Sequence, residues 1–379
     1  MKIIVAPDSF KESLGAAEAA QAIAQGIKAV LPGAEVMLLP VADGGEGTVA
    51  ALVRDGRGQV MSTEVTGPLG DPVRASWGIL RDGTAVLEMA AASGLPLVPP
   101  QQRNPMDAST LGTGELIIAA LDQGCPRILL GLGGSATNDG GAGALAALGV
   151  KFLDARGRTV PPTPRGLLEL AKLDISGVDP RLVDVVVDVA CDVDNPLLGP
   201  RGASRVFAPQ KGADAAMVEV LEKALDNLAR IARRDLGKDI SSFPGSGAAG
   251  GLAAGLSLVA RINLRPGIEL VLETLQFPEH LKNAALVITG EGKIDAQSVM
   301  GKALSGVARA ARERGVPVIA LCGALGEGYQ AVHAAGIQAA VPIVSGPMTR
   351  EEAMANARQL LTETAARVLR LLLTLPKDC

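Results

Sequence analysis

The sequence predicts an α/β protein built around parallel sheet. Short apolar runs alternate with amphipathic helical stretches at both ends of the chain, and this alternation is typical of parallel strands joined by crossover helices. Hydrophobic residues make up 48% of the chain but aromatic residues only 2%, so the cores must be built from Ala, Val, Leu and Ile. A length of 379 residues favours two domains over one.

The first part of the chain predicts two strands and two helices. Residues 2–6 form a continuous apolar run, which is typical of a strand buried on both faces. Residues 15–31 carry apolar side chains three and four positions apart, which predicts an amphipathic helix. Residues 35–39 are the expected second strand, and residues 45–53 the second helix.

The pattern changes near residue 60. Three extended segments that alternate in polarity, with a turn signal at Asp82-Gly83, predict antiparallel hairpins. The elements expected in the middle of the chain are strands at 60–65, 73–80, 84–89, 128–132 and 181–191 and helices at 107–122, 139–149 and 214–234.

Strands and crossover helices return after residue 280. Thr349 and Glu352 have the spacing of a capping box at the start of the last helix. The other elements expected here are strands at 285–289, 316–321 and 338–343 and helices at 301–314 and 327–335.

The two ends of the chain are therefore expected to share one sheet. We predict a discontinuous, Rossmann-like parallel-sheet domain made of residues 1–65 plus 285–379. A mixed α/β domain of residues 66–284 is inserted into it. The active site is expected in the cleft between the two domains.

Composition argues against several classes of protein. A net charge of −4 without a basic block, together with few aromatic residues, argues against nucleic-acid binding. Four widely spaced Cys and two His give no zinc ligand set and fit a reducing cytoplasm. No uninterrupted apolar stretch reaches about 18 residues, and the apolar run at the start is too short for a signal peptide. We expect a cytoplasmic protein without a membrane span.

The loops that follow the first two strands carry candidate site residues, because ligands of parallel sheets bind beyond the carboxyl ends of the strands. The first loop holds Ser9 and Lys11. A bound anion would explain Lys11, because a cation at a helix N-terminus opposes the macrodipole; helix capping by Asp8 or Ser9 is the alternative reading of this loop. In the second loop Asp43 and Glu46 could bind a metal ion or a hydroxyl, and an N-cap pair explains them equally well.

The loop after the strand at 128–132 is rich in glycine and polar side chains. Gly133 and Gly134 form a turn between a strand and a helix, which is an anion-binding arrangement. Ser135 and Asn138 add a hydroxyl and an amide that suit phosphate or a polar substrate. The same turn matches the dinucleotide fingerprint, a motif that is weak on its own.

Charged residues follow two further strands. Asp192 comes directly after an apolar run, where a carboxylate is costly unless it has a partner or a function. Gly290 and Gly292 are interleaved with acids and lysines that include Lys293 and Asp295. Amides and cations that hold phosphates, and acids that hold magnesium or receive a proton, suit phosphoryl transfer. The P-loop motif is absent.

Three further segments have an open interpretation. Residues 199–203 and 209–213 supply Arg201 and Lys211 for phosphates. The uncharged, glycine-rich residues 245–255 are explained equally well by close helix packing and by backbone contact with a nucleotide.

Together these motifs resemble the type I glycerate kinases of bacteria over almost the whole chain. The resemblance is carried by residues 6–14, 40–48, 103–105, 112–116, 133–141, 190–197, 209–213 and 289–298. It implies ATP and Mg²⁺ as cofactors, D-glycerate as substrate, and the 2-hydroxyl as acceptor, which gives 2-phosphoglycerate and ADP. The chemistry of the residues alone does not distinguish the 2-hydroxyl from the 3-hydroxyl.

A role follows for each candidate residue. Asp192 is the expected general base, with Asp295 as the second candidate, and Lys11 and Lys293 are expected to neutralise phosphate or substrate charge. The expected substrate-binding residues are Ser9, Arg103, Ser135 and Asn138, the expected cofactor-binding residues are Gly133, Gly134, Gly290 and Gly292, and the expected metal ligand is Asp43. Two alternatives stay open, a dehydrogenase and a non-enzymatic sensor of a nucleotide or sugar acid.

Overall fold

A computed structural model describes residues 1–53, 56–299 and 302–374. Within these ranges the chain forms two compact units. The terminal unit consists of Met1–Asp43, Ala50–Leu52 and the chain from Ile268 onward, and the middle unit consists of Gly44–Val49 and Val53–Gly267. Each unit is described by itself below.

The terminal unit contains a five-stranded sheet with the order β13-β12-β11-β1-β2 in which all strands are parallel. The strands are β1 (Lys2–Pro7), β2 (Glu35–Leu38), β11 (Ala284–Ile294), β12 (Val318–Leu325) and β13 (Ala339–Pro342). Strand β1 lies between β2 and β11, so the two ends of the chain share one parallel sheet, as predicted.

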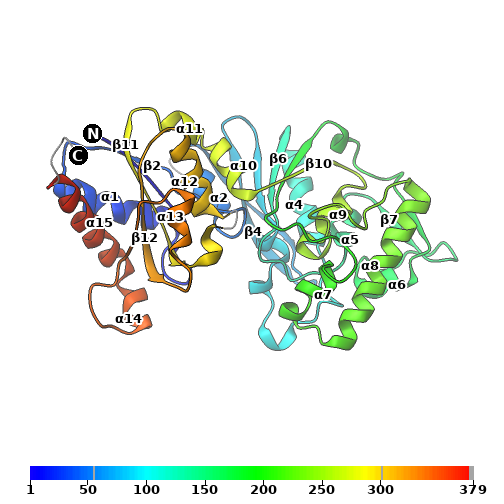
Figure 1. Ribbon diagram of the computed structural model, residues 1–379. Helices are drawn as coiled ribbons and strands as arrows, with labels where there is room; N and C mark the ends of the chain where they lie inside the picture. The colour runs from blue at the N-terminus through cyan, green and yellow to red at the C-terminus, as the bar shows by residue number, and fades with distance from the viewer. Residues whose placement is uncertain (54–55, 300–301, 375–379) are drawn as a thin grey trace. The chain divides into compact units, whose positions relative to one another are not determined.

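Helices cover this sheet. They are α1 (Ala16–Val30), α10 (Gly267–Thr274), α11 (Phe277–His280), α12 (Ala303–Glu313), α13 (Ala331–Ala335), α14 (Arg350–Ala355) and α15 (Ala357–Leu373), with the 3₁₀ turn η6 (Ala296–Val299). Helices α1 and α15 lie side by side (Figure 1), and Ile23 and Leu361 from them are buried with Ile3 and Val5 of β1. The core of this unit therefore joins the first and last elements of the chain.

The middle unit contains a six-stranded sheet with the order β10-β9-β6-β5-β4-β3. The strands are β3 (Gly58–Thr66), β4 (Pro72–Leu80), β5 (Ala85–Glu88), β6 (Arg127–Gly131), β9 (Val186–Ala190) and β10 (Arg261–Arg265). Strands β3, β4 and β5 form the predicted antiparallel hairpins, and β5, β6, β9 and β10 are parallel. The expected mixed sheet is confirmed.

Among the described residues, two large hydrophobic cores stabilise the middle unit, one beside the large sheet around Trp77 and one beside helix α8 (Ala215–Leu236) around Phe152, and a smaller one includes Met106 and Leu221. The second core includes a small hairpin of β7 (Lys151–Leu153) and β8 (Lys172–Asp174). The remaining helices of the middle unit are α3 (Ala90–Ser93), α4 (Leu111–Asp122), α5 (Ala142–Ala147), α6 (Pro164–Glu169), α7 (Ala203–Phe207) and α9 (Leu252–Leu256), with 3₁₀ turns at Leu95–Leu97, Pro100–Gln102, Pro180–Val183, Pro209–Lys211 and Ala248–Gly250. Helix α2 (Thr48–Val53) is divided, because its residues Ala50–Leu52 belong to the terminal unit.

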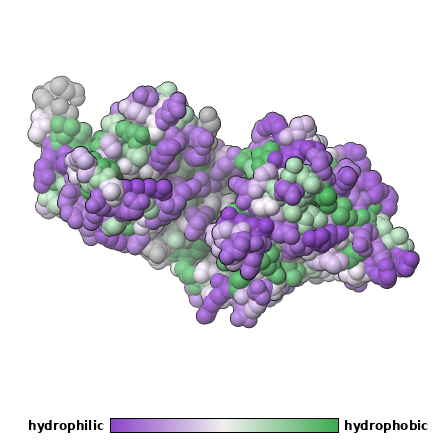
Figure 2. Space-filling view, turned by 90° about the horizontal axis from the view of Figure 1, so that it is seen from below, coloured by the Kyte–Doolittle hydropathy of each residue, from purple (hydrophilic) through white to green (hydrophobic). Residues whose placement is uncertain are grey.

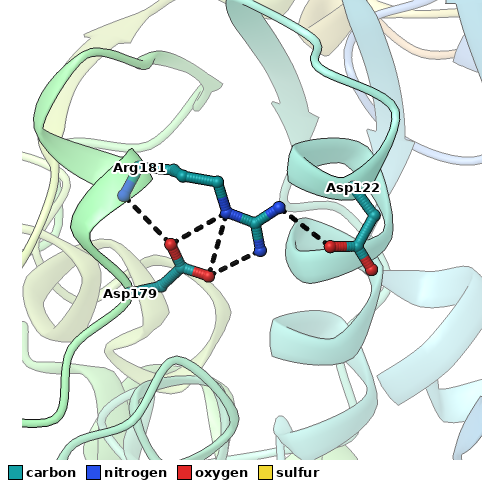
Figure 3. Close-up of polar contacts among 3 residues, drawn as sticks. All are labelled: Asp122, Asp179 and Arg181. Atoms are coloured by element: carbon teal, nitrogen blue, oxygen red, sulfur yellow. Dashed lines mark hydrogen bonds and ion pairs between the residues drawn. The ribbon is translucent and has the colours of Figure 1, made fainter.

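An exposed arginine links two elements of the middle unit. Arg181 binds the carboxylate of Asp179 two residues before it and that of Asp122 at the end of α4 (Figure 3). All three side chains reach solvent, so this network fixes a turn on the surface and contributes little to the free energy of unfolding.

Several expected helices are shorter in the structure. Helix α2 begins at Thr48 rather than at residue 45, α4 begins at Leu111 rather than at residue 107, and α5 spans only Ala142–Ala147 of the expected 139–149. Before α5, Gly140 and Gly141 have φ of +63° and +76°, a left-handed conformation that interrupts a helix. Gly301, the first residue of an expected helix, lies outside the described residues.

The last expected helix is two helices. The Thr349 hydroxyl accepts from the N–H of Glu352 at 3.1 Å, and the Glu352 carboxylate accepts from the N–H of Thr349 at 2.8 Å, so the predicted capping box is present. Helix α14 nevertheless ends at Ala355, and α15 continues after Asn356.

The face shown in Figure 2 mixes polar and apolar residues, with small hydrophobic areas scattered among hydrophilic ones. None of the helices in the described ranges combines the length and the apolar character that crossing a membrane requires.

Candidate functional site

Three carboxylates lie close together in the terminal unit, two of them in the loops that follow β1 and β2 and the third within β11. Pro7 of β1 pairs with Gly290 of β11, so the next residues along these strands, Asp8 and Glu291, are neighbours, and Asp43 follows β2 on the other side of β1. Burial and the negative charges of Asp43 and Glu291 raise the pKa of Asp8 to about 7. The hydrogen bond from Ser9 and the positive charge of Lys11 lower this pKa, but by less. We call these three residues the acid cluster.

The acid cluster contains an unpaired buried oxygen. Oε1 of Glu291 has no hydrogen-bond partner, and burial raises the pKa of this carboxyl against a hydrogen bond from Ser298 and the charge of Lys302. Crowded carboxylates of raised pKa are the environment that a bound cation would stabilise. The described residues form no ready group of three metal-ligating side chains, and magnesium commonly needs only one or two carboxylates when phosphates complete its coordination.

The loop that carries Ser9 and Lys11 is a compact turn ahead of helix α1. Phe10 N–H donates to the carbonyl of Leu14 at 2.8 Å, and the helix begins only at Ala16. Helix capping by Asp8 or Ser9 is therefore wrong, and so is the helix-dipole argument for an anion at Lys11, which lies before the helix. Lys11 is exposed, and its charge acts on Asp8 and Glu291.

Gly290 and Gly292 lie within β11, which continues to Ile294 instead of ending at the expected residue 289, and they allow close packing of neighbouring strands. A Cβ on Gly290 would lie 2.2 Å from the carbonyl oxygen of Leu321, so only glycine fits there. Lys293 forms an ion pair with Asp295, at 3.1 Å between Nζ and Oδ2. Asp295 also accepts the N–H of Gln297, and these contacts lower its pKa. A carboxylate of lowered pKa is a poor proton acceptor, so Asp295 is a weaker candidate base than the sequence indicated.

In the middle unit the register aligns the carboxyl ends of three strands. Glu88 of β5 pairs with Gly131 of β6, and Gly131 pairs with Ala190 of β9. Residues 131–141, which we call the glycine loop, therefore start at the same sheet edge as the loop that holds Asp192. A Cβ on Gly131 would lie 2.2 Å from the carbonyl oxygen of Gly44, so the loop after β2 packs directly on the glycine loop.

Glu88 is a residue that sequence reasoning missed. Its carboxylate accepts the N–H of Val49 at 2.7 Å. Burial raises its pKa, while hydrogen bonds from the N–H groups of Val49, Gly47 and Thr48 lower it. Glu88 thus holds the start of helix α2, a task that its position at a strand end did not reveal.

The polar side chains of the glycine loop are buried. Asp139 accepts four hydrogen bonds, from the N–H and hydroxyl of Thr110 and from the N–H groups of Gly141 and Gly143. Burial raises the pKa of this carboxyl. All four of its partners are hydrogen-bond donors, however, and four donors suit the ionised carboxylate, which only accepts hydrogen bonds. Asn138 donates to the Ser204 hydroxyl at 3.0 Å.

Two atoms of the same loop have no partner. Asn138 Oδ1 and Thr137 Oγ1 are fully buried and make no hydrogen bond. Unpaired buried polar atoms are costly, and they are common where a ligand or water completes the structure. The predicted residue Asn138 is therefore part of an incompletely satisfied polar site.

A lysine lies beneath the glycine loop. Nζ of Lys211 donates to the Ser135 hydroxyl at 2.8 Å and to the carbonyl of Thr137 at 2.6 Å. Burial lowers the pKa of Lys211 to about 7, and the charge of Asp139 opposes that shift only in part. The sequence had proposed Lys211 as a phosphate-binding cation but gave no sign that the amine is buried.

Arg103 lies against the segment that holds Lys211. A Cβ on Gly212 would be 2.3 Å from the carbonyl oxygen of Arg103, and Arg103 Nε is buried without a hydrogen-bond partner. The middle unit thus contains the predicted residues Arg103, Ser135 and Asn138, with Lys211 added by the structure.

Asp192 differs from expectation in one respect. Its side chain is exposed, so its carboxylate does not carry the burial cost that first drew attention to it. One of its oxygens accepts the N–H of Gly267 at 2.9 Å. Asp194, two residues later, is also exposed and forms an ion pair with Arg201. This ion pair leaves Arg201 less available for binding phosphates.

The glycine-rich residues 245–255 are explained by packing. A Cβ on Gly250 would lie 2.1 Å from the carbonyl oxygen of Thr137, and one on Gly255 would lie 2.3 Å from that of Gly140. These glycines let the backbone of α9 and its preceding turn support the glycine loop from behind.

Comparison with known proteins adds the family. The glycerate kinase family model matches residues 3–373. The chain belongs to the glycerate kinase family. A glycerate kinase of Bacillus subtilis is 52% identical, with 96% of each chain covered, and a glycerate 2-kinase of Escherichia coli is 49% identical, with 94% of each covered. A crystal structure from Salmonella typhimurium LT2, of a candidate glycerate kinase 2, superimposes with a TM-score of 0.89 at 47% identity over 98% of each chain.

The resemblance drawn from the motifs is thus confirmed, and so are glycerate kinase activity and the prediction of a phosphotransferase. Membership of the glycerate kinase family also decides against the two alternatives, a dehydrogenase that uses the glycine loop for a dinucleotide and a non-enzymatic sensor.

Proposed function

We propose that this chain transfers the γ-phosphoryl group of ATP to the 2-hydroxyl of D-glycerate, giving 2-phosphoglycerate and ADP. The observation that carries the proposal is the glycine loop of a glycerate kinase family member, with its buried unpaired atoms on Thr137 and Asn138 above a buried lysine. A small, polar, anionic substrate suits such a loop. The relative in Escherichia coli that is named a glycerate 2-kinase supports the choice of hydroxyl.

We assign the glycerate carboxylate to Arg103, Ser135 and Asn138. Arg103 Nε is buried without a partner, and the Ser135 hydroxyl accepts a hydrogen bond from Lys211, which leaves its own proton for a ligand. Gly133 and Gly134 keep their assignment to the cofactor, because a loop backbone without side chains allows phosphates to approach its N–H groups. Ser9 stays a prediction for the substrate.

We assign Mg²⁺ to the acid cluster, with Asp43 as the predicted ligand and Asp8 added by the structure. The crowding that raises the pKa of Asp8 and the unpaired oxygen of Glu291 support this assignment. When bound, magnesium would neutralise charge on the phosphates of ATP. Lys11 and Lys293 supply further positive charge in the same unit, and Gly290 and Gly292 remain assigned to the nucleotide.

Asp192 is the proposed general base that accepts the proton of the glycerate hydroxyl. Its exposed carboxylate follows β9 at the edge where the glycine loop starts. Asp192→Asn should lower kcat by about 10²–10⁴-fold, the usual contribution of a general base. The matched control is Asp194→Asn, two residues away and also exposed, and it should keep kcat near the wild-type value. Equal turnover in the two variants would refute the assignment.

The function itself is tested by coupled ADP release with D-glycerate, followed by identification of the product by NMR. D-glycerate-dependent ADP release with 2-phosphoglycerate as product is expected. Formation of 3-phosphoglycerate would refute the assignment of the hydroxyl, and absence of D-glycerate-dependent ADP release would refute the reaction. The cytoplasmic location stays a prediction, for which the free thiols of Cys125, Cys191 and Cys322 give support.

A further inference from the structure

Lys211 is almost fully enclosed. Its relative exposure is 2%, that of Thr137 and Asn138 is 0%, and that of Ser135 is 9%. Ser135 is therefore the polar side chain of this group through which a ligand can reach the buried amine. The two acceptors of Lys211, the Ser135 hydroxyl and the Thr137 carbonyl, are both uncharged.

The charged groups around Lys211 do not neutralise it. The carboxylate of Asp139 acts on it through space, but that carboxylate is already bound by four donors. Arg205 of α7 is paired with Glu219 of α8, and the backbone of Arg103 lies beside Gly212, the residue after Lys211. A buried amine in this setting is held near the balance between its charged and neutral forms.

The hydrogen bond from Lys211 fixes the direction of the Ser135 hydroxyl. A hydroxyl that accepts from an amine keeps its own proton as a donor. Both the neutral amine and the ammonium have enough N–H groups to donate to Ser135 and Thr137. Protonation of Lys211 therefore changes the charge beneath the loop without breaking the contacts that shape it.

We propose that Lys211 is a positioning residue of this enzyme, which aims the Ser135 hydroxyl at the carboxylate of D-glycerate and takes up a proton when that carboxylate binds. The proposal rests on the proposed function. A negative charge bound at Ser135 favours the ammonium form, so binding and protonation support each other. Substrate binding should consequently draw a proton from solvent at a pH where the free enzyme holds a neutral amine.

The pH range in which this proton uptake occurs follows from the pKa of Lys211 in the free enzyme. With the pKa of Lys211 at about 7, roughly a tenth of the free chains hold this proton at pH 8 and most hold it at pH 6. Complete protonation in the complex would give an uptake of up to about 0.9 proton per chain at pH 8, and of only about 0.1 at pH 6. The carboxyl group of glycerate is ionised at both values and contributes nothing.

Isothermal titration calorimetry with D-glycerate measures this uptake when each pH is run in two suitable buffers, Tris and HEPES at pH 8 and MES and phosphate at pH 6, because buffers absorb different amounts of heat when they give up a proton. Wild-type enzyme should show the uptake at pH 8 and almost none at pH 6, and this comparison needs no variant. Lys211→Gln keeps a donor but cannot titrate, so its uptake at pH 8 should vanish. Lys211→Met should also weaken D-glycerate binding by at least about tenfold, because the Ser135 hydroxyl loses its fixed direction.

The control is Lys223→Met, which removes an exposed lysine of α8 in the same unit and should leave both uptake and affinity unchanged. A second arm uses a non-hydrolysable ATP analogue with magnesium. Uptake in that arm alone would mean that nucleotide phosphate, and not the glycerate carboxylate, causes the protonation of Lys211, and it would overturn the proposal.

Uptake that persists in Lys211→Gln, or its absence from wild-type enzyme that binds D-glycerate, would also overturn the proposal while leaving the reaction intact. If D-glycerate neither binds nor supports ADP release, the proposed function fails, and the role of Lys211 fails with it.

Discussion

The buried amine of Lys211 should make the folded protein more stable as pH rises above 7. An unfolded chain holds the lysine proton up to a pKa of about 10.4, whereas burial lowers the pKa of the folded protein to about 7. Below pH 7 both states hold the proton. Between pH 7 and 10 the unfolded state binds more protons than the folded state, so the free energy of unfolding rises with pH. Above pH 10 both states are neutral.

The size of the effect follows from the same values. The slope is about 1.4 kcal/mol per pH unit inside the window, which sums to on the order of 4 kcal/mol from pH 7 to 10. Lys211 is only 2% exposed, so little of this is lost to screening by solvent. Lys211→Met removes the titrating group and should flatten this part of the pH dependence.

Urea unfolding at pH 6.5, 8 and 9.5 measures the slope. Trp77 is the single tryptophan of the chain and lies buried in the middle unit, the unit that holds Lys211, so its fluorescence reports the right region. Asp139 is present in both proteins, so its own titration cancels to first order in the difference. A free-energy difference between wild type and Lys211→Met that stays constant from pH 6.5 to 9.5 would refute the reasoning.

Three further changes test the packing and the ion pairs. Gly131→Ala should destabilise the protein by about 1–3 kcal/mol, because the new Cβ would lie 2.2 Å from the Gly44 carbonyl oxygen. The control is Gly33→Ala, whose Cβ would meet no atom within 4 Å. Circular dichroism should show a lower melting temperature for the first variant and an unchanged one for the control. Asp188→Ala should cost about 1.5–3 kcal/mol in the Trp77 assay, because it removes a buried carboxylate that accepts hydrogen bonds from the half-exposed Arg127 and from Asn263. Arg181→Ala removes only exposed contacts and should cost less than about 1 kcal/mol; a larger loss would contradict the surface role given to it.

The parallel strands were predictable where they form a continuous apolar run, and the parallel strand β10 was missed because it does not form one. Residues 2–6 and 285–289 read as strands because burial on both faces leaves a continuous apolar run, and the structure pairs them. Strand β10 (Arg261–Arg265) was not predicted because about half of its residues are polar. Its Asn263 donates a hydrogen bond to the buried Asp188, a partner 75 residues away in the sequence. Only the folded sheet makes that polar residue suitable for a strand.

The candidate site was likewise predictable only in part from the sequence. The sequence located the glycine loop, because a glycine-rich turn after a buried strand is a local signal. It did not show that Lys211 is buried, because the enclosing atoms of Ser135 and Thr137 lie more than seventy residues earlier in the chain. The raised pKa of Asp8 likewise depends on Glu291, which becomes its neighbour only through the pairing of β1 with β11.

The charges of the two units favour different ligands. The acid cluster crowds Asp8, Asp43 and Glu291, and it would repel a carboxylate that arrives without a cation. Beside the glycine loop lie the basic residues Arg103 and Lys211, and the carboxylate of Asp139 in the loop already accepts four hydrogen bonds. We therefore propose that magnesium binds at the acid cluster and that the glycerate carboxylate binds beside Ser135 of the glycine loop. On the same grounds Ser9, which is adjacent to Asp8, is disfavoured as a contact for the glycerate carboxylate, and exchange of Ser9 for Ala should raise the KM for D-glycerate less than exchange of Ser135 for Ala.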